Sequence, residues 1–243
     1  MVSRSQLKYI QSLGQKKYRD EEEVFVAEGP KLVKELIESK NAELMQIYAL
    51  NEWIEDNKDL LRSVNVTAIN ETELERTSQL KTPNKVIAIV KKFEVNEPGI
   101  KERISLVLDT IRDPGNLGTI IRIADWFGVS QIICSTDCAD MYNSKVVQAT
   151  MGSIARVNVF YTDLPVWLEQ RSGVRIYAAM LEGKDVTKMS TIKEGLIIIG
   201  NESMGINKEV LQYSNEKISI PRKGSAESLN AAVATGIILS HLV

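Results

Sequence analysis

The chain has 243 residues, of which 44% are hydrophobic and 26% are charged, and its formal net charge is −2. This composition is typical of a globular protein and excludes intrinsic disorder, a collagen-like repeat and a disulfide scaffold. The near-neutral charge balance excludes a global positive field, so a nucleic-acid site would have to be a local basic patch. At roughly 150 residues per domain, the length suits one or two domains.

Potential metal ligands are scarce. Cys134 and Cys138 are accompanied by a single histidine, His241, whereas a zinc site needs about four ligands. We therefore expect no metal. The sequence shows no signal peptide and no apolar run of about 18 residues, which predicts a reducing, cytoplasmic location and no membrane association.

The first half of the chain alternates between strand and helix patterns. Leu7, Ile10 and Leu13 recur at helical spacing and predict a short amphipathic helix before Gly14. Apolar runs typical of strands then alternate with helical patterns. The expected strands cover residues 24–27, 44–49, 66–69 and 86–90, and the expected helices cover residues 30–37, 51–62 and 71–80.

The alternation restarts after residues 94–103, whose charged and turn-forming residues predict a linker. Strands that alternate with helices imply sheets covered on both faces, so we expect two α/β domains. In the second half, the expected strands cover residues 104–108, 131–134, 175–179, 196–199 and 217–220, and the expected helices cover residues 117–127, 143–151, 164–170, 207–213 and 227–242.

A basic cluster lies in the first twenty residues. Its five cations stand against one acid, Asp20, and could attract RNA phosphates. A solvated polar helix face is the alternative interpretation. The cations are Arg4, Lys8, Lys16, Lys17 and Arg19.

Three expected strands of the second half run into polar loops, where open α/β sheets bind ligands. The first loop leads to Asn116, Gly118 and Arg122. The apolar neighbours of Arg122 predict a buried guanidinium, which would need an anionic partner or a wet cleft. A structural ion pair with Asp125 or Asp109 is the alternative.

The second loop follows the apolar strand 196–199 and contains Gly200, Asn201, Glu202 and Gly205. Glycines at this place allow the backbone to approach a ligand closely, although generic strand-to-helix turns use the same residues. The third loop leads into an apolar final helix, whose small residues would permit close packing, as across a subunit interface. Glu227, Ser228 and Asn230 are expected in its first turn, and only one cap is needed there.

Together the three loops resemble the motifs of the SpoU family of RNA ribose methyltransferases, in the SPOUT class. The matching segments are the N-x-G-x-x-x-R pattern of residues 116–122, then residues 197–206, then residues 218–234. The resemblance implies a methyltransferase domain at 104–243 with a deep trefoil knot. It also implies a substrate-binding domain at 1–93, similar to a ribosomal protein fold, a homodimer formed through the knotted domain, and S-adenosylmethionine as cofactor.

The resemblance also implies roles for single residues. For the cofactor, it implies contacts with Gly200, Asn201, Gly205, Ile220 and Leu229. For catalysis and substrate orientation, it implies Asn116, Arg122, Glu202, Ser228 and Asn230. One departure concerns Arg222 and Lys223, because many members carry an apolar residue after the proline of the third motif.

A guanidinium with a pKa above about 12 is an unsuitable general base at neutral pH. We therefore expect Arg122 to clamp a phosphate, while water or Glu202 takes the proton. The additional amino-terminal domain favours ribosomal RNA, 23S in particular, as substrate. The alternatives are a transfer RNA ribose methyltransferase and an RNA-binding module without activity. A dehydrogenase is disfavoured because the chain lacks a G-x-G-x-x-G motif.

Overall fold

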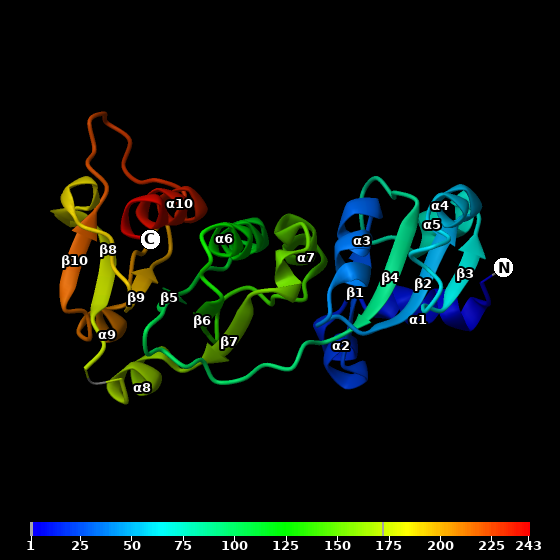
Figure 1. Cartoon of the computed structure of the whole chain (residues 1–243), viewed down its shortest axis with the longest axis horizontal. Coiled ribbons are helices and arrows are strands. Elements are labelled where there is room, and N and C mark those ends of the chain that lie inside the picture. Colours follow the sequence, from blue (N-terminus) through cyan, green and yellow to red (C-terminus); the bar gives the residue numbers. More distant parts are fainter. Residues whose placement is uncertain (1, 172) are drawn as a thin grey trace. The chain divides into compact units, whose positions relative to one another are not determined.

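The computed structural model describes residues 2–171 and 173–243 and contains two compact units (Figure 1). Unit 1 comprises Met1–Glu94 and Asp140–Ala155, and unit 2 comprises Val95–Ala139 and Arg156–Val243. The segment Asp140–Ala155 therefore packs with the amino-terminal part of the chain, although the range 104–243 was expected to form the second domain. Each unit has its own sheet.

The sheet of unit 1 has four strands in the order β1-β4-β2-β3. β4 is antiparallel to both of its neighbours, whereas β2 and β3 are parallel, so the sheet is mixed. All four strands lie where apolar runs predicted them. Their bounds are Val24–Glu28 (β1), Leu44–Leu50 (β2), Val66–Ile69 (β3) and Val86–Lys91 (β4).

The helices of unit 1 bury apolar side chains against this sheet. Ile10 and Leu13 from the first helical segment and Leu74 from α5 share a core cluster with Ile87 and Ile89 of β4. Two helices form where one was predicted, because the chain turns at residues 13–15. The helices are Arg4–Ser12 (α1), Lys16–Glu22 (α2), Pro30–Glu38 (α3), Asn51–Asp56 (α4), Glu71–Thr77 (α5) and Ser144–Thr150 (α7), followed by the 3-10 turn Ser153–Ala155 (η1).

The sheet of unit 2 has six strands in the order β10-β8-β9-β5-β6-β7, and every pairing is parallel. This confirms the prediction of an α/β fold with a parallel sheet. β7 was not predicted. The bounds are Ile104–Leu108 (β5), Gln131–Ser135 (β6), Asn158–Thr162 (β7), Ile176–Asp185 (β8), Gly195–Ile199 (β9) and Glu216–Ser219 (β10).

Helices cover both faces of this sheet (Figure 1). Trp167 and Leu168 of α8 and Val210 of α9 pack against Val107 and Ile198 on one face. On the other face α6 and α10 pack against each other. The helices are Pro114–Trp126 (α6), Leu164–Glu169 (α8), Lys208–Leu211 (α9) and Ala231–Leu242 (α10), and Val186–Lys188 (η2) is a 3-10 turn.

Candidate active site

The site lies where β5 and β9 end. The two strands are parallel neighbours, and Leu108 pairs with Ile199 at their carboxyl ends. The loops that follow them, which begin at Asp109 and Gly200, therefore start side by side at one edge of the sheet. This is the edge at which parallel α/β sheets bind ligands.

Gly200 lies against the backbone of its own loop. A Cβ atom at Gly200 would stand 2.5 Å from the carbonyl carbon of Gly205 and 2.6 Å from the nitrogen of Ile206. The loop folds back on itself, since the Asn201 N–H donates to the Gly205 carbonyl at 3.1 Å and the Gly205 N–H donates to the Asn201 carbonyl at 2.9 Å. Gly205 also has a φ of +69°, which favours glycine. Both glycines are therefore required by the shape of this loop.

Replacing Gly200 by alanine is expected to destabilise the protein by about 1–3 kcal/mol, because a backbone contact this short must be relieved by moving the loop. The midpoint of urea denaturation measures this effect. Gly224→Ala is the matched control, since a Cβ atom there meets nothing within 4 Å. Equal stability of the two variants would contradict the close approach at Gly200.

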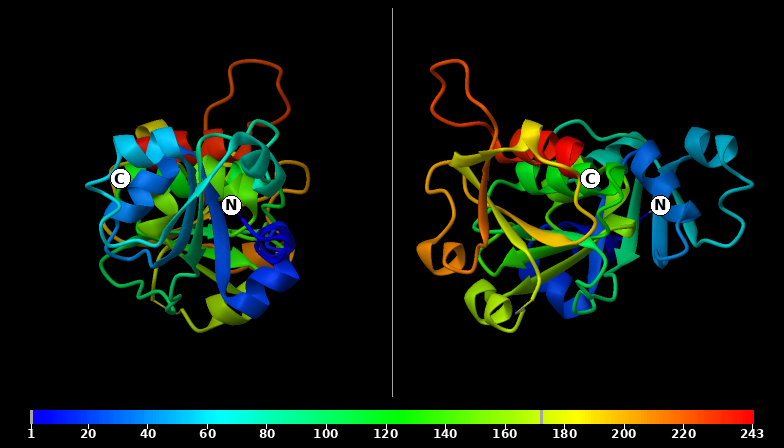
Figure 2. Two further views of the ribbon diagram at one scale, coloured as in Figure 1. Left: turned by 90° about the vertical axis from the view of Figure 1, so that its right-hand side faces the viewer. Right: turned by 60° about the vertical axis from the view of Figure 1, so that its left-hand side comes forward.

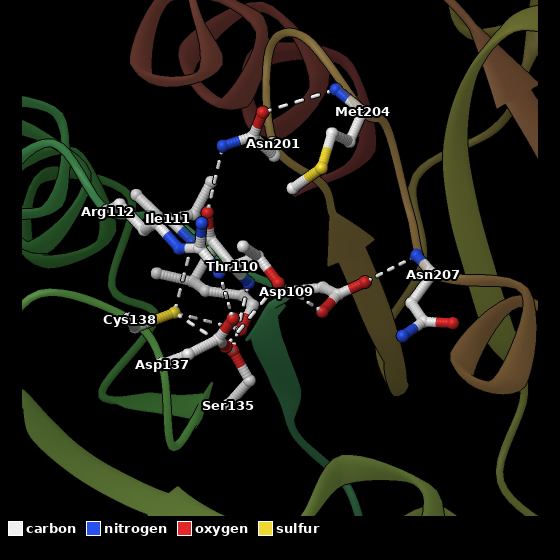
Figure 3. A network of polar contacts seen from close by, with 11 residues as sticks. Asp109, Thr110, Ile111, Arg112, Ser135, Asp137, Cys138, Asn201, Met204 and Asn207 are labelled. Carbon is white, nitrogen blue, oxygen red and sulfur yellow. Dashed lines mark hydrogen bonds and ion pairs between the residues drawn. The ribbon is translucent and has the colours of Figure 1, made fainter.

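Asp109 and Thr110 hold both ends of the Gly200–Asn207 loop (Figure 3). The Asn201 amide donates to the Thr110 carbonyl at 3.0 Å, and the backbone N–H of Asn207 donates to the buried carboxylate of Asp109 at 2.6 Å. The Asn201 side-chain oxygen accepts the N–H groups of Ser203 and Met204. The sequence analysis missed Asp109, Thr110 and Asn207 as positioning residues. An acid directly after a buried strand was the available signal.

A second set of contacts supports Thr110 from β6 (Figure 3). The Thr110 N–H donates to the Ser135 hydroxyl at 2.9 Å, and the Ile111 N–H contacts the Cys138 sulfur at 3.2 Å. The pKa of Asp137 lies below its usual value. The main cause is the hydrogen bond from the Ser135 hydroxyl, and a smaller one is the hydrogen bond from Arg112. Thr110 has a φ of +60°, an unusual conformation for a residue with a side chain, and these contacts fix it.

Three predicted residues from three separate segments meet in one hydrogen-bonded cluster, which we call the Asn116–Glu202–Asn230 cluster: Asn116 lies in the first turn of α6, Glu202 in the loop after β9 and Asn230 at the N-cap of α10. The Asn116 side-chain amide donates to Glu202 Oε1, and the Asn230 amide donates to Asn116 Oδ1 at 2.8 Å. The backbone N–H of Ala231 also points at Glu202 Oε1, at 3.4 Å. The first turn of α10 therefore faces a carboxylate, a favourable arrangement for the helix dipole.

Asn230 has a second role as the N-cap of α10. Its side-chain oxygen accepts the N–H groups of Ala232 and Val233, at 3.0 and 3.2 Å. The predicted helix start at residue 227 is therefore wrong, because α10 begins at Ala231. Glu227 and Ser228 lie in the exposed loop before the helix instead of its first turn.

Arg122 is exposed on α6, so its predicted burial is wrong. Its helix neighbours Ile120 and Ile121 point into the core, while Arg122 lies on the outer side. In the part of the chain that the structure describes, Arg122 forms no hydrogen bond or ion pair. The alternative partners are engaged elsewhere, since Asp125 pairs with Arg156 at 2.9 Å and Asp109 accepts the Asn207 N–H.

The predicted cofactor residues lie in two loops. Gly200, Asn201 and Gly205 form the folded loop after β9. Ile220 is half-buried directly after β10, and Leu229 is 45% exposed just before α10. No hydrogen bond among the described residues joins Ser228 or Leu229 to the Asn116–Glu202–Asn230 cluster.

The five cations of the basic cluster in unit 1 differ in their exposure to solvent. Arg4, Lys8, Lys16 and Lys17 are exposed. Arg19 is buried: its guanidinium donates to the carbonyls of Leu13 and Gly14, each at 2.9 Å, and pairs with Asp140 at 2.6 Å. Arg19 is therefore unavailable to RNA phosphates, because its side chain is buried inside unit 1.

Residues 2–171 and 173–243 contain neither a candidate metal site nor a candidate membrane-spanning helix. No group of three or more potential metal-binding side chains comes together there. No helix in this part of the chain combines the length and the apolar character needed to span a membrane.

The parallel sheet with polar loops at its carboxyl edge defines an α/β protein whose candidate ligand site lies at that edge. Residues 103–240 match the SpoU rRNA Methylase family, and residues 4–88 match the MRM3-like substrate binding domain. The first match covers more than half of the chain. The protein therefore belongs to the SpoU rRNA methylase family.

Individual relatives match over nearly the whole chain. The 23S rRNA (guanosine(2553)-2'-O)-methyltransferase RlmP of Bacillus subtilis is 29% identical over 93% of this chain and 91% of its own. The structure of an AdoMet-bound rRNA methyltransferase from Sinorhizobium meliloti has a TM-score of 0.85 at 30% identity, covering 99% of this chain and 95% of that one. The structure of a Porphyromonas gingivalis protein assigned to the TrmH family has a TM-score of 0.85 at 34% identity. The match covers 99% of this chain and 98% of that one.

Proposed function

We propose that this protein is an S-adenosylmethionine-dependent methyltransferase that acts on a ribose 2'-hydroxyl of ribosomal RNA, with 23S RNA as the substrate. The observation that carries the proposal is the Asn116–Glu202–Asn230 cluster, which joins residues from all three family motifs at the carboxyl edge of the sheet. RlmP and the Sinorhizobium meliloti enzyme support the choice of ribosomal RNA.

The loops after β9 and β10 fit the cofactor. Gly200 and Gly205 leave backbone without side chains at the sheet edge, and a Cβ atom at Gly200 would be blocked. Gly200, Asn201, Gly205, Ile220 and Leu229 would hold S-adenosylmethionine, chiefly through backbone groups. When bound, the cofactor supplies an activated methyl group, so the protein has to align the hydroxyl and manage one proton.

Glu202 is the proposed acceptor of that proton. Its Oε1 atom already faces the amide of Asn116 and the N–H of Ala231. Its Oε2 atom has no partner in the described part of the chain and is therefore the oxygen proposed to take the proton, directly or through a water molecule. Asn230 keeps Asn116 turned toward Glu202, so both asparagines act on the carboxylate.

Arg122 is the proposed phosphate clamp. A guanidinium binds phosphate oxygens in a bidentate fashion and stays protonated at neutral pH. Its exposure on α6, without a carboxylate partner among the described residues, leaves it available to RNA. From this position it would orient the ribose and stabilise the negative charge that develops on the 2'-oxygen. Ser228 is proposed to orient the same substrate.

The remaining family properties belong to the same proposal. Residues 104–243 are proposed to contain the deep trefoil knot, and residues 1–93 are proposed to bind RNA through Arg4, Lys8, Lys16 and Lys17, with residues 94–103 as linker. A homodimer through the knotted domain is supported by the exposed apolar side chains of Trp126 on α6 (86%) and Val233 on α10 (51%). The proposed location is the cytoplasm.

Calorimetric titration with S-adenosylmethionine and S-adenosylhomocysteine tests the cofactor site. Saturable binding is expected for both ligands, and Leu229→Arg is expected to abolish it. Transfer of radiolabelled methyl groups to a 23S RNA transcript and to large ribosomal subunits tests the reaction. Binding of neither ligand, together with no methyl transfer to either RNA substrate, would contradict the proposed function.

A further inference from the structure

Residues 221–230, which lie between β10 and α10, carry two cations that the proposed mechanism does not use. We call this segment the β10–α10 loop. Every residue in it is exposed, and the loop projects beyond the strand and the helix that it joins (Figures 1 and 2). Arg222 and Lys223 lie at its start, directly after Pro221. Their position in the exposed loop leaves both side chains accessible to a ligand.

Neither cation is neutralised within residues 2–171 and 173–243. Among these residues, Arg222 donates only to the Ala226 carbonyl of its own loop, at 3.3 Å, and Lys223 forms no hydrogen bond or ion pair. Glu227, the only acid of the loop, pairs with neither of them. Four other arginines of unit 2 do pair with carboxylates: Arg112, Arg156, Arg171 and Arg175.

The topology places this loop at the same sheet edge as the candidate active site. β10 is parallel to β8, which is parallel to β9, so the chain leaves β10 at the edge where Gly200 follows β9. The loop then ends at Asn230, whose amide binds Asn116. Arg122 stands on α6, which packs against α10. The unpaired cations of the loop and Arg122 therefore belong to the elements that build the site.

We propose that Arg222 and Lys223 form an additional phosphate-binding site, which holds the RNA backbone next to the nucleotide to be methylated. The inference rests on the proposed function. A guanidinium and an ammonium group on adjacent residues suit two neighbouring phosphates. Such contacts position RNA without reading its sequence. They also release bound counterions, so their contribution to affinity decreases as the salt concentration rises.

The test compares Arg222→Ala/Lys223→Ala with Lys101→Ala/Lys193→Ala, which removes the same charge. Lys101 and Lys193 are exposed and precede β5 and β9, at the opposite edge of the sheet. The dissociation constant for a 23S RNA transcript is measured between low and high salt. The slope of its logarithm against log[salt] is expected to fall by about 1.4–1.8 for the loop variant, or about 0.7–0.9 per phosphate. The control variant is expected to keep the slope. Both are expected to keep their affinity for S-adenosylhomocysteine.

Three results would overturn the inference and leave the proposed function intact, provided that the wild-type protein methylates the transcript. They are an unchanged slope for the loop variant, an equal decrease in both variants, and a parallel loss of S-adenosylhomocysteine binding in the loop variant. The last would assign the two cations to the cofactor pocket. An unmodified protein that neither binds nor methylates RNA would instead overturn the proposed function, and this inference with it.

Discussion

Replacing Arg122 by alanine is expected to lower the rate constant of methyl transfer about 100- to 1000-fold, the usual cost of removing a group that stabilises developing charge. The protein should remain folded, because Arg122 is exposed and the substitution breaks no ion pair among the described residues. Single-turnover transfer of a labelled methyl group to 23S RNA measures the effect. Affinity for S-adenosylhomocysteine should be unchanged.

Two further variants make this prediction specific. Arg122→Lys keeps the charge but loses the bidentate geometry, so it should remain strongly impaired. Arg175→Ala is the control, because Arg175 precedes β8 at the opposite sheet edge, its own side chain is 62% exposed, and Glu216 keeps Lys184 as a second partner. Turnover by Arg122→Lys close to that of the unmodified protein would exclude the clamp. If an Arg122 variant had a raised KM for RNA and an unchanged kcat, Arg122 would contribute to binding of the substrate and not to stabilisation of the transition state.

Replacing Asp140 by alanine is expected to destabilise unit 1 by about 3–5 kcal/mol, because it leaves the Arg19 guanidinium buried without a counterion. The Arg19 side chain is only 4% exposed and that of Asp140 is 19% exposed. Asp140 also accepts the N–H of Tyr142, which would lose its partner. Urea denaturation followed by circular dichroism measures the change.

An exposed ion pair in the same unit provides the control. Arg62 pairs with Asp59, but their side chains are 79% and 90% exposed, so Asp59→Ala should leave stability unchanged. Adding Arg19→Met to Asp140→Ala should restore part of the loss, since the double variant no longer buries a lone charge. Equal midpoints for Asp140→Ala and Asp59→Ala would show that Arg19 reaches solvent when its partner is removed.

The strands could be predicted wherever both faces are buried, because such strands form continuous apolar runs. Four of the five residues of β5 are apolar, the exception being Ser105, and all of β9 is buried. β7 was missed because it lies at the edge of its sheet and only Val159 is fully buried. The other four residues of β7 are only partly buried, so this strand lacks the continuous buried run on which the prediction depended.

The residue types of the site could be predicted, but several of its contacts could not. Asn116, Glu202 and Asn230 were identified from their motifs, and the structure brings them together. The hydrogen bond that the Asn207 N–H donates to Asp109 has a backbone donor, so the sequence does not reveal it. The burial of Arg19 was equally invisible, because its carboxylate partner lies 121 residues further along the chain.

The placement of Asp140–Ala155 in unit 1 has a consequence for how the protein is synthesised. Translation delivers the chain in order, so the first 94 residues emerge from the ribosome long before their last packing segment. At roughly 5–20 residues per second, the intervening stretch delays completion of unit 1 by several seconds. Until Asp140 has been synthesised, the Arg19 guanidinium lacks the carboxylate with which it pairs in the folded protein, so unit 1 cannot complete its folding before this later part of the chain is made.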